Sequence, residues 1–124
     1  MPANSPEELF GLIGKGLNNG DLDGLVALYE PNACLVAEPG EVALGTDAMR
    51  EAFEGFLSVK PVFTLESQNY VHMGDLVVSF VSWNLTGTDA DGSAVTMIGN
   101  STEVARQQPD ATWLYVFDSP FGGA

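Results

Sequence analysis

Positive charge is scarce in this sequence. Its 124 residues include 4 lysines and arginines but 17 aspartates and glutamates, which gives a net charge of −13 at pH 7. A field of that sign repels the phosphate backbone of nucleic acids and the surface of anionic membranes, so we expect neither as a partner. The acidic residues are spread along the chain and form no tail, which is typical of a solvated protein surface.

Cysteine and histidine are nearly absent, with one residue of each at Cys34 and His72. A lone cysteine forms no intramolecular disulfide, and the apolar run around Cys34 suits a small buried side chain. One histidine and one cysteine argue against a zinc or haem site. The glycines of the first predicted helix also lack the strand–turn–helix context of a phosphate-binding loop. We therefore expect no metal and no cofactor.

Long hydrophobic runs are also missing. The sequence has no stretch of about 18 apolar residues, so no transmembrane helix is predicted. The N-terminus carries Glu7 and Glu8 where a signal peptide has a basic segment, and we expect a cytoplasmic protein. A length of 124 residues suits a single domain, which we expect to extend over residues 1–124.

The first half of the chain has the signals of helices. Ser5-Pro6-Glu7-Glu8 has the pattern of a capping box at the start of a first helix. Asp21 predicts the start of a short second helix that includes Tyr29. A third helix is predicted to begin near Thr46, with Phe53 in its apolar stripe. Three helices are therefore expected before residue 60.

The second half has the composition of antiparallel strands. Valine, threonine and aromatic residues are frequent there, and short turns separate the runs. The predicted strands, including one in the first half, are residues 33–37, 62–73, 75–88, 93–107 and 112–118. Helices followed by a long meander indicate an α+β fold, with the helices packed on one face of a strongly curved sheet.

Four patches of the sequence are shared with one known superfamily. They are residues 27–33 (ALYEPNA), 45–50 (GTDAMR), 74–78 (GDLVV) and the hairpin of residues 101–113. With the order of elements, they resemble the nuclear transport factor 2-like superfamily, especially its bacterial polyketide-cyclase-like (SnoaL-like) branch. The resemblance implies a cystatin-like fold: a cone-shaped, curved antiparallel sheet and three N-terminal helices that enclose a pocket.

The resemblance leaves the activity open, because the superfamily contains ketosteroid isomerases, dehydratases, cyclases, epoxide hydrolases and proteins without catalysis. A ketosteroid isomerase holds an enolate with a tyrosine and a second carboxylic acid, and Tyr29 is a candidate for that tyrosine. Kinase-association members have basic pocket residues, and this chain has Glu103 where an arginine is expected.

The predicted hairpins also indicate which side chains share a face of the sheet. Side chains alternate along a strand, and turns with an even number of residues fix which residues lie opposite each other. On these registers Glu103 and Asp118 are diagonal neighbours on the concave face, with Cβ atoms about 7–8 Å apart. The ligand-binding residues predicted around them are Tyr29, Phe53, Asn69, Phe80, Ser82, Asn84, Ser101 and Val116.

Glu103 and Asp118 are the predicted catalytic residues. Two carboxylates in an apolar cavity repel each other and lose hydration, which raises the pKa of one of them. A protonated and an ionised carboxyl group suit isomerisation, dehydration or aldol cyclisation of one substrate. The alternative is structural: each carboxylate accepts hydrogen bonds from neighbouring hydroxyl groups or from Arg106 or Arg50.

The opposite face of the predicted sheet is rich in aromatic residues, namely Trp83, Trp113, Tyr115 and Phe117. Exposed rings in this number favour a homodimer formed through the convex face. The alternative is that some of these rings cover the edge of the sheet itself. His72 falls on the polar, outward side of its strand, and we expect it to be a surface residue.

Three functions remain open from the sequence. The first is a pocket that binds a small apolar molecule and carries out cofactor-free acid–base chemistry, as an isomerase, cyclase or dehydratase. The second is a carrier or sensor that binds a ligand in the same pocket without catalysis. The third is a dimeric interaction module in which the pocket is a remnant of packing.

Overall fold

The structure, a computed structural model, describes residues 3–38 and 40–122. Within these ranges the elements are α1 (Pro6–Asn19), α2 (Leu22–Val26), β1 (Tyr29–Glu38), β2 (Glu41–Leu44), α3 (Gly45–Leu57), β3 (Val62–Met73), β4 (Leu76–Thr88), β5 (Ala94–Gln107) and β6 (Trp113–Ser119). The four predicted strands of the second half coincide with β3 to β6 to within about one residue at each end. No helix in the described ranges is long and apolar enough to cross a membrane.

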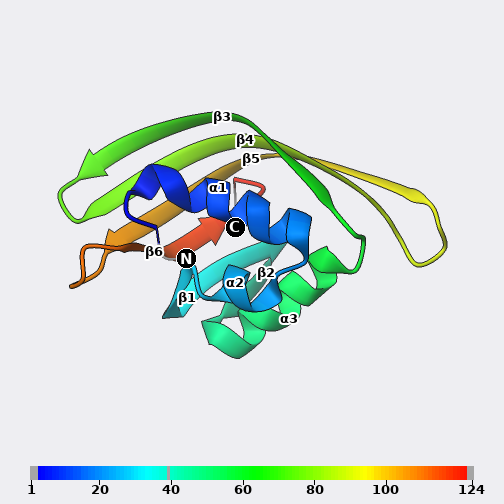
Figure 1. The fold of residues 1–124 in the computed structure, drawn as a ribbon, viewed down its shortest axis with the longest axis horizontal. Coiled ribbons are helices and arrows are strands. Elements are labelled where there is room, and N and C mark those ends of the chain that lie inside the picture. The colour runs from blue at the N-terminus through cyan, green and yellow to red at the C-terminus, as the bar shows by residue number, and fades with distance from the viewer. Residues whose placement is uncertain (1–2, 39, 123–124) are drawn as a thin grey trace.

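The strands of the described residues form a six-stranded sheet in the order β2-β1-β6-β5-β4-β3. Neighbouring strands are antiparallel, except that β1 and β6 run parallel. The long strands β3, β4 and β5 arch over α1, and the hairpin of β4 and β5 extends beyond the helices (Figure 1). This curved, unclosed sheet with helices on its concave side confirms the predicted α+β fold. We call the helix-covered side the inner face and the opposite side the outer face.

The start of β1 differs from the sequence prediction. Asp21 caps α2 as predicted, because its carboxylate accepts a hydrogen bond from the Gly24 N–H at 3.0 Å. The helix nevertheless ends at Val26, and Tyr29 is the first residue of β1. The reason is pairing with β6, in which Tyr29 lies opposite Tyr115. Tyr29 is therefore fixed by the sheet and not by a helix.

The pairing of β4 with β5 is shifted by one residue from the predicted register. Asn69 lies opposite Phe80 as predicted, and Glu66 forms a bulge near the start of β3. Across the next pair, however, Ser101 lies opposite Val81 and not opposite Phe80. A shift of one residue exchanges the faces, so β4 and β5 contribute a different combination of side chains to the inner face than predicted.

The cause of this shift is the loop between β4 and β5. Thr88 pairs with Ala94, so the loop contains five residues, 89–93, where four were assumed. The Asp89 carboxylate accepts hydrogen bonds from the N–H groups of Asp91 (2.9 Å) and Ser93 (3.0 Å), which closes the longer turn. An aspartate that satisfies backbone donors inside its own turn stabilises this loop length.

The pairing of β5 with β6 contains two deviations that compensate. Gln107 pairs with Trp113, so this loop also has five residues and shifts the register by one. A bulge at Val116 then shifts it again, and Glu103 lies directly opposite Asp118. Because two shifts of one residue restore the original face, the predicted sharing of a face by the two carboxylates is correct.

The aromatic side chains that were predicted to lie on the convex face occupy the core instead. Trp83, Trp113 and Tyr115 are buried on the inner face, and only Phe117, which is half-buried, pairs with the outer-face residue Val104. The register shifts explain the correction, since they move these strand positions beneath the helices. The surface predicted for a homodimer is therefore wrong, while the homodimer itself stays a prediction.

The outer face exposes apolar side chains of a different set. Phe80 is 46% exposed and Ile98 is 77% exposed. Other large apolar side chains exposed on strands β3 and β2 are Val62, Val71, Met73, Val42 and Leu44.

Candidate functional site

Four polar side chains form one row across the inner face. The row runs from Tyr70 on β3 to Ser79 on β4, Glu103 on β5 and Asp118 on β6, each directly opposite the next. Directly opposite residues on one face have Cβ atoms about 4.5–5.5 Å apart. The two carboxylates are therefore closer than the diagonal placement that the sequence predicts.

Both carboxylates are buried, and in each of them one oxygen accepts a hydrogen bond while the other has no partner among the described residues. Glu103 is 0% exposed and Asp118 is 4% exposed. The Ser79 hydroxyl donates to Glu103 Oε1 at 2.6 Å, and the Tyr29 hydroxyl donates to Asp118 Oδ2 at 2.5 Å. Glu103 Oε2 and Asp118 Oδ1 have no hydrogen-bond partner among the described residues. Buried acceptors without a partner are costly, so each of these two oxygens has an open position for a proton or a water molecule.

Burial raises the pKa of both carboxyl groups. The pKa of Asp118 rises from 3.8 to about 7 because the group loses hydration, although the Tyr29 hydrogen bond acts in the opposite direction. The pKa of Glu103 rises from 4.5 to about 8 through loss of hydration and then through the negative charge of Asp118, while the hydroxyls of Ser101 and Ser79 lower it. At neutral pH the pair therefore retains a proton that exposed carboxyl groups lose.

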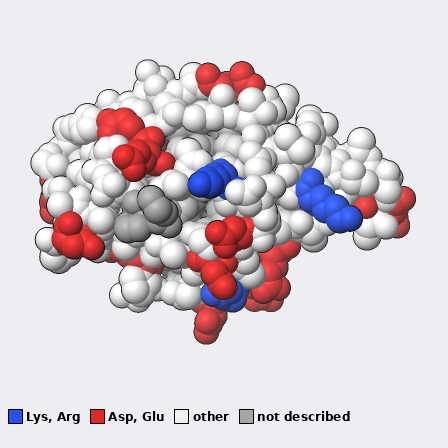
Figure 2. All heavy atoms as spheres, in the orientation of Figure 1, with Lys and Arg blue, Asp and Glu red and all other residues white. Residues whose placement is uncertain are grey.

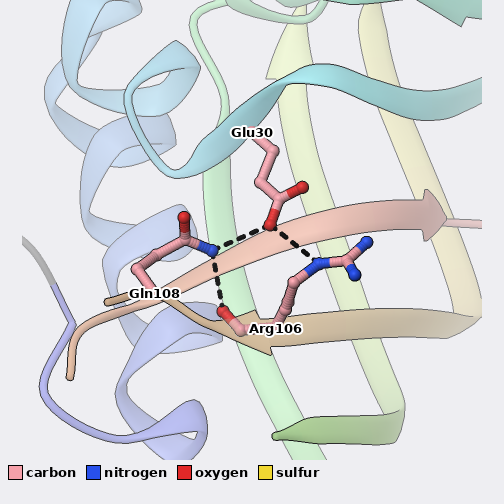
Figure 3. A network of polar contacts seen from close by, with 3 residues as sticks. All are labelled: Glu30, Arg106 and Gln108. Carbon is pink, nitrogen blue, oxygen red and sulfur yellow. Dashed lines mark hydrogen bonds and ion pairs between the residues drawn. The ribbon is translucent and has the colours of Figure 1, made fainter. Parts of the chain in front are cut away.

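The two arginines of the structural alternative are paired elsewhere. Arg106 Nε donates to Glu30 Oε2 at 3.0 Å, and Gln108 Nε2 donates to the same oxygen at 2.8 Å (Figure 3). Arg50 donates to Asp23 at 2.7 Å on the helical side of the molecule. The sequence suggested two kinds of hydrogen-bond donor for the carboxylates, hydroxyl groups and arginines. Only hydroxyl groups donate to Glu103 and Asp118.

Three tyrosines surround the pair, and sequence reasoning identified one of them. Tyr29 and Tyr115 are buried with their ring centroids 5.4 Å apart, and the pKa of each is raised well above its ordinary value, mainly by burial. Burial also raises the pKa of Tyr70 to about 12, and its hydroxyl has no partner among the described residues. Tyr70, Ser79 and Tyr115 were missed as site residues because the assumed registers put them on other faces or rows.

A small cavity adjoins Asp118. Its volume is about 40 Å³, enough for a few atoms. Tyr29 and Phe53, both predicted as ligand-binding residues, line it together with Asp118, whereas Glu103 does not. The remaining lining residues, nearly all apolar, are Phe10, Ile13, Leu17, Leu35, Phe56, Phe63, Trp83, Leu85 and Pro120. Asp118 is thus the carboxylate that a molecule in this cavity would contact.

The other predicted ligand-binding residues do not meet at this cavity. Ser101 is buried on the inner face, where its hydroxyl donates to the Val81 carbonyl at 3.3 Å. Four others lie on the outer face because of the register shift: Asn69, Phe80, Ser82 and Asn84. Two of these four bond to outer-face neighbours: Ser82 donates to Asn100 at 2.7 Å, and Asn84 donates to Glu66 at 2.5 Å. The last, Val116, is the bulge residue of β6.

A larger and more open groove lies outside the cavity. Its volume is about 900 Å³, and it runs between α3, the β1–β2 hairpin and the segment after β6. Neither Glu103 nor Asp118 lines it. The described residues contain no group of three or more histidine, cysteine or carboxylate side chains placed to hold a metal ion. We place the candidate site at the small cavity, because Asp118 lines it.

Comparisons with known proteins agree with this fold. A model of the SnoaL-like domain family matches residues 13–116. A nuclear transport factor 2-like superfamily protein from Salmonella enterica is 19% identical, with a TM-score of 0.83 over 94% of this chain and 87% of that one. A candidate calcium/calmodulin-dependent protein kinase II association domain from Xanthomonas campestris is 24% identical, with a TM-score of 0.79 over 92% and 84%.

A candidate dehydratase of the same nuclear transport factor 2-like family, from Streptomyces avermitilis, is 17% identical, with a TM-score of 0.78 over 92% of each chain. Identities this low show a shared fold and no more. The curated proteins that were compared include no match to this chain.

Proposed function

This chain belongs to the SnoaL-like domain family, and we propose that it is a cofactor-free acid–base enzyme of the isomerase, cyclase or dehydratase type. The observation that carries the proposal is Asp118, a buried carboxylate that lines an apolar cavity and keeps one oxygen without a partner. A dehydratase-type neighbour with the same fold is in keeping with this chemistry. The substrate class is a small apolar molecule with an acidic C–H bond.

In the proposed reaction Asp118 exchanges a proton with carbon. The ionised carboxylate takes a proton from the carbon next to a carbonyl group through its free Oδ1, and the electron pair of that C–H bond moves towards the carbonyl oxygen. The neutral carboxyl group then returns the proton to another carbon, or to a leaving hydroxyl group. A pKa of about 7 suits both directions, because each protonation state is populated near neutral pH.

Glu103 and Tyr29 act through Asp118 in this proposal. Glu103 does not line the cavity, so we assign it as a positioning residue in place of the direct catalytic role predicted from the sequence. In this proposal Glu103 holds the proton that the pair retains while Asp118 is ionised and accepts the Tyr29 hydrogen bond. The Tyr29 hydroxyl fixes Oδ2 of Asp118, and Oδ1 keeps no hydrogen-bond partner among the described residues.

Proton exchange in heavy water tests this function without knowledge of the natural substrate. Tetralone and cyclohexanone, both apolar ketones, would be incubated with the protein in D2O, and loss of their α-proton signals followed by NMR. We expect exchange above the buffer rate, and a decrease of about 100-fold or more in Asp118→Asn, as for removal of a general base. The matched control is Asp75→Asn, which removes one exposed carboxylate from the β3–β4 turn.

Two outcomes would contradict the proposed enzyme. The first is equal exchange in the parent protein and in Asp118→Asn. The second is binding of the ketones, seen as shifts of protein resonances around the cavity, without any exchange above buffer. That second result would identify a ligand carrier.

The homodimer is retained as a separate proposal. Its support is the exposed apolar outer face, in which Phe80 and Ile98 are the large exposed side chains of β4 and β5. A second copy of the chain packed on this face would cover them.

A further inference from the structure

The wall between the small cavity and the large groove is one side chain thick. Phe56, which is half-buried, lines both spaces. On α3, Ala52 lines the groove and the next residue, Phe53, lines the cavity. After β6, Pro120 lines the cavity and Phe121 lines the groove. At three places in the chain, therefore, the two spaces are separated by a single residue or by two consecutive residues.

A chain of aromatic contacts leads from the groove to the buried carboxylate. The ring centroids of Phe56 and Phe53 are 6.2 Å apart, and those of Phe53 and Tyr29 are 5.6 Å apart. The Tyr29 hydroxyl then donates to Asp118 at 2.5 Å. Phe56, Phe53 and Tyr29 thus form a continuous line of contacts from the groove to the carboxylate.

The cavity is too small to hold a whole substrate, whereas the groove is large enough. About 40 Å³ accommodates a few atoms, and about 900 Å³ accommodates a molecule of drug size. The side of α3 that faces the groove carries small residues, Ala48, Ala52 and Gly55, at helical spacing. Apart from the backbone of the helix and the two neighbouring residues, no atom lies within 4 Å of the position that a Cβ atom would take at Gly55. A ligand can therefore approach the helix closely.

The negative charge of the groove favours a positively charged ligand. Its lining includes the carboxylates of Glu38, Glu41 and Glu51, and it includes neither lysine nor arginine among the described residues. Arg50, which is next to Glu51 in the sequence, is engaged by Asp23 at 2.7 Å. Acidic side chains are also spread over the surface seen in Figure 2, including the lower edge where α2 and α3 lie. This field repels anions and attracts cations.

We propose that the groove along α3 is the outer half of the ligand site of Asp118, and that it takes an apolar molecule carrying a positively charged amine. The apolar part of the ligand lies against Phe56, Met97 and Phe121, its amine lies among the three glutamates, and its reactive end reaches Asp118 past Phe56. The inference rests on the proposed function, because Asp118 supplies the inner end of the site.

Two fluorescent probes with matched structures test the proposal. Dansylcadaverine has a flexible tail ending in an ammonium group, and dansyl aminohexanoate has a tail of the same length ending in a carboxylate. We expect dansylcadaverine to bind at least about tenfold more tightly in low salt, with an increase in dansyl fluorescence.

Variants on α3 locate the binding. Gly55→Leu fills the groove and should abolish binding of dansylcadaverine, while the added side chain favours the helix. Gly11→Leu is the control, since Gly11 is also helical, also has no atom near its Cβ position and does not line the groove. Glu51→Gln should weaken binding about threefold, and Glu54→Gln, on the same helix outside the groove, should leave it nearly unchanged.

The outcomes separate this inference from the proposed function. Equal affinity for the two probes, or unchanged binding in a Gly55→Leu protein with a normal thermal unfolding curve, would overturn the groove while leaving Asp118-dependent proton exchange intact. If Gly55→Leu loses binding of dansylcadaverine but unfolds at the same temperature as the parent protein, and Gly11→Leu still binds, the groove site is supported. Proton exchange that fails while dansylcadaverine still binds in the groove would overturn the coupling of the groove to Asp118 chemistry.

Discussion

The two faces of the same sheet each depart, in opposite directions, from the usual distribution of side chains. The inner face buries two carboxyl groups, Glu103 and Asp118, among aromatic rings, while the outer face exposes Phe80 and Ile98. Burial of unpaired carboxyl groups destabilises a fold, and exposed apolar side chains gain nothing for a monomer. The difference is in keeping with the reaction that we propose at the inner face and with the partner that we propose on the outer face.

The largest expected contrast is between Trp83→Glu and Phe80→Glu, which change β4 on opposite faces. Trp83 is buried, stacks on Phe63 at 5.7 Å and donates to the Pro120 carbonyl at 2.8 Å. We expect its replacement by glutamate to cost about 4 kcal/mol or more, because it leaves a cavity and an unpaired buried charge. Phe80→Glu should change the free energy of unfolding of the monomer by less than about 1 kcal/mol.

Urea unfolding measures both variants, and light scattering adds the test of the outer face. If the outer face forms the homodimer, the parent protein has about twice the 13.1 kDa mass of the monomer and Phe80→Glu has the monomer mass. A parent protein that is monomeric at micromolar concentration contradicts the dimer. Equal destabilisation by the two glutamates contradicts the assignment of the faces.

The next largest effect concerns the pH dependence of stability. The pKa values of both Glu103 and Asp118 are raised in the folded state, so the folded protein binds more protons than the unfolded chain between about pH 4 and 8. The free energy of unfolding should therefore decrease by several kcal/mol as the pH rises through this window. Asp118→Asn should be less sensitive to pH and, at pH 8, more stable than the parent by about 1–2 kcal/mol.

Unfolding by urea at pH 5 and at pH 8 measures this effect, with Asp75→Asn as the control for loss of an exposed carboxylate. A parent protein whose stability increases from pH 5 to pH 8 contradicts the raised pKa values. Marked destabilisation of Asp118→Asn at pH 8 would show that the carboxylate is a structural acceptor.

A smaller effect is expected from Tyr29→Phe, which removes the hydroxyl that donates to Asp118. The lost hydrogen bond should lower the free energy of unfolding by about 1–2 kcal/mol at pH 8, where Asp118 is ionised. The pKa of Asp118 should rise further, since this hydrogen bond is the contact that lowers it. Urea unfolding and carboxyl NMR measure the two changes. An unchanged Asp118 pKa would mean that the hydroxyl does not contact the carboxylate in solution.

The smallest effect is expected at His72, which is exposed and 3.2 Å from Glu7 of α1. Both side chains are about half exposed, and exposed ion pairs contribute little. His72→Gln should change the free energy of unfolding by less than about 0.5 kcal/mol. A loss of several kcal/mol, measured by urea unfolding at pH 6, would contradict a surface role for this residue.

The sequence was sufficient for the fold class, for the helices α1 and α3 and for the strands β3 to β6, because helical periodicity and strand runs are local signals. It did not predict β2, and it placed Tyr29 in a helix. The sequence also predicted correctly that Glu103 and Asp118 share a face, but partly because two errors in the predicted register cancel. A five-residue loop and a bulge at Val116 each shift the register of β6 by one residue, and the two shifts cancel. The position of Asp118 on the inner face is therefore correct for a reason that the alternation pattern did not contain.

The ligand-binding residues were harder to predict because loop length decides the face of every residue that follows. The Asp89 side chain closes a five-residue loop where four residues were assumed, and this exchanges Phe80 for Val81 on the inner face. Tyr29 was identified through the family resemblance, although its place at the start of β1 depends on pairing with β6. Contacts between distant strands cannot be inferred from local patterns alone.

Direct titration of the two carboxyl groups is the most direct test of a reactive inner face. The carboxyl carbon resonances of Glu103 and Asp118 can be followed by NMR from pH 4 to pH 9, with the Asp118→Asn protein used for assignment. We expect the pKa of Asp118 near 7 and that of Glu103 near 8, with a lower pKa for Glu103 when residue 118 is asparagine. Two groups that both titrate near their ordinary values of about 4 would contradict the account.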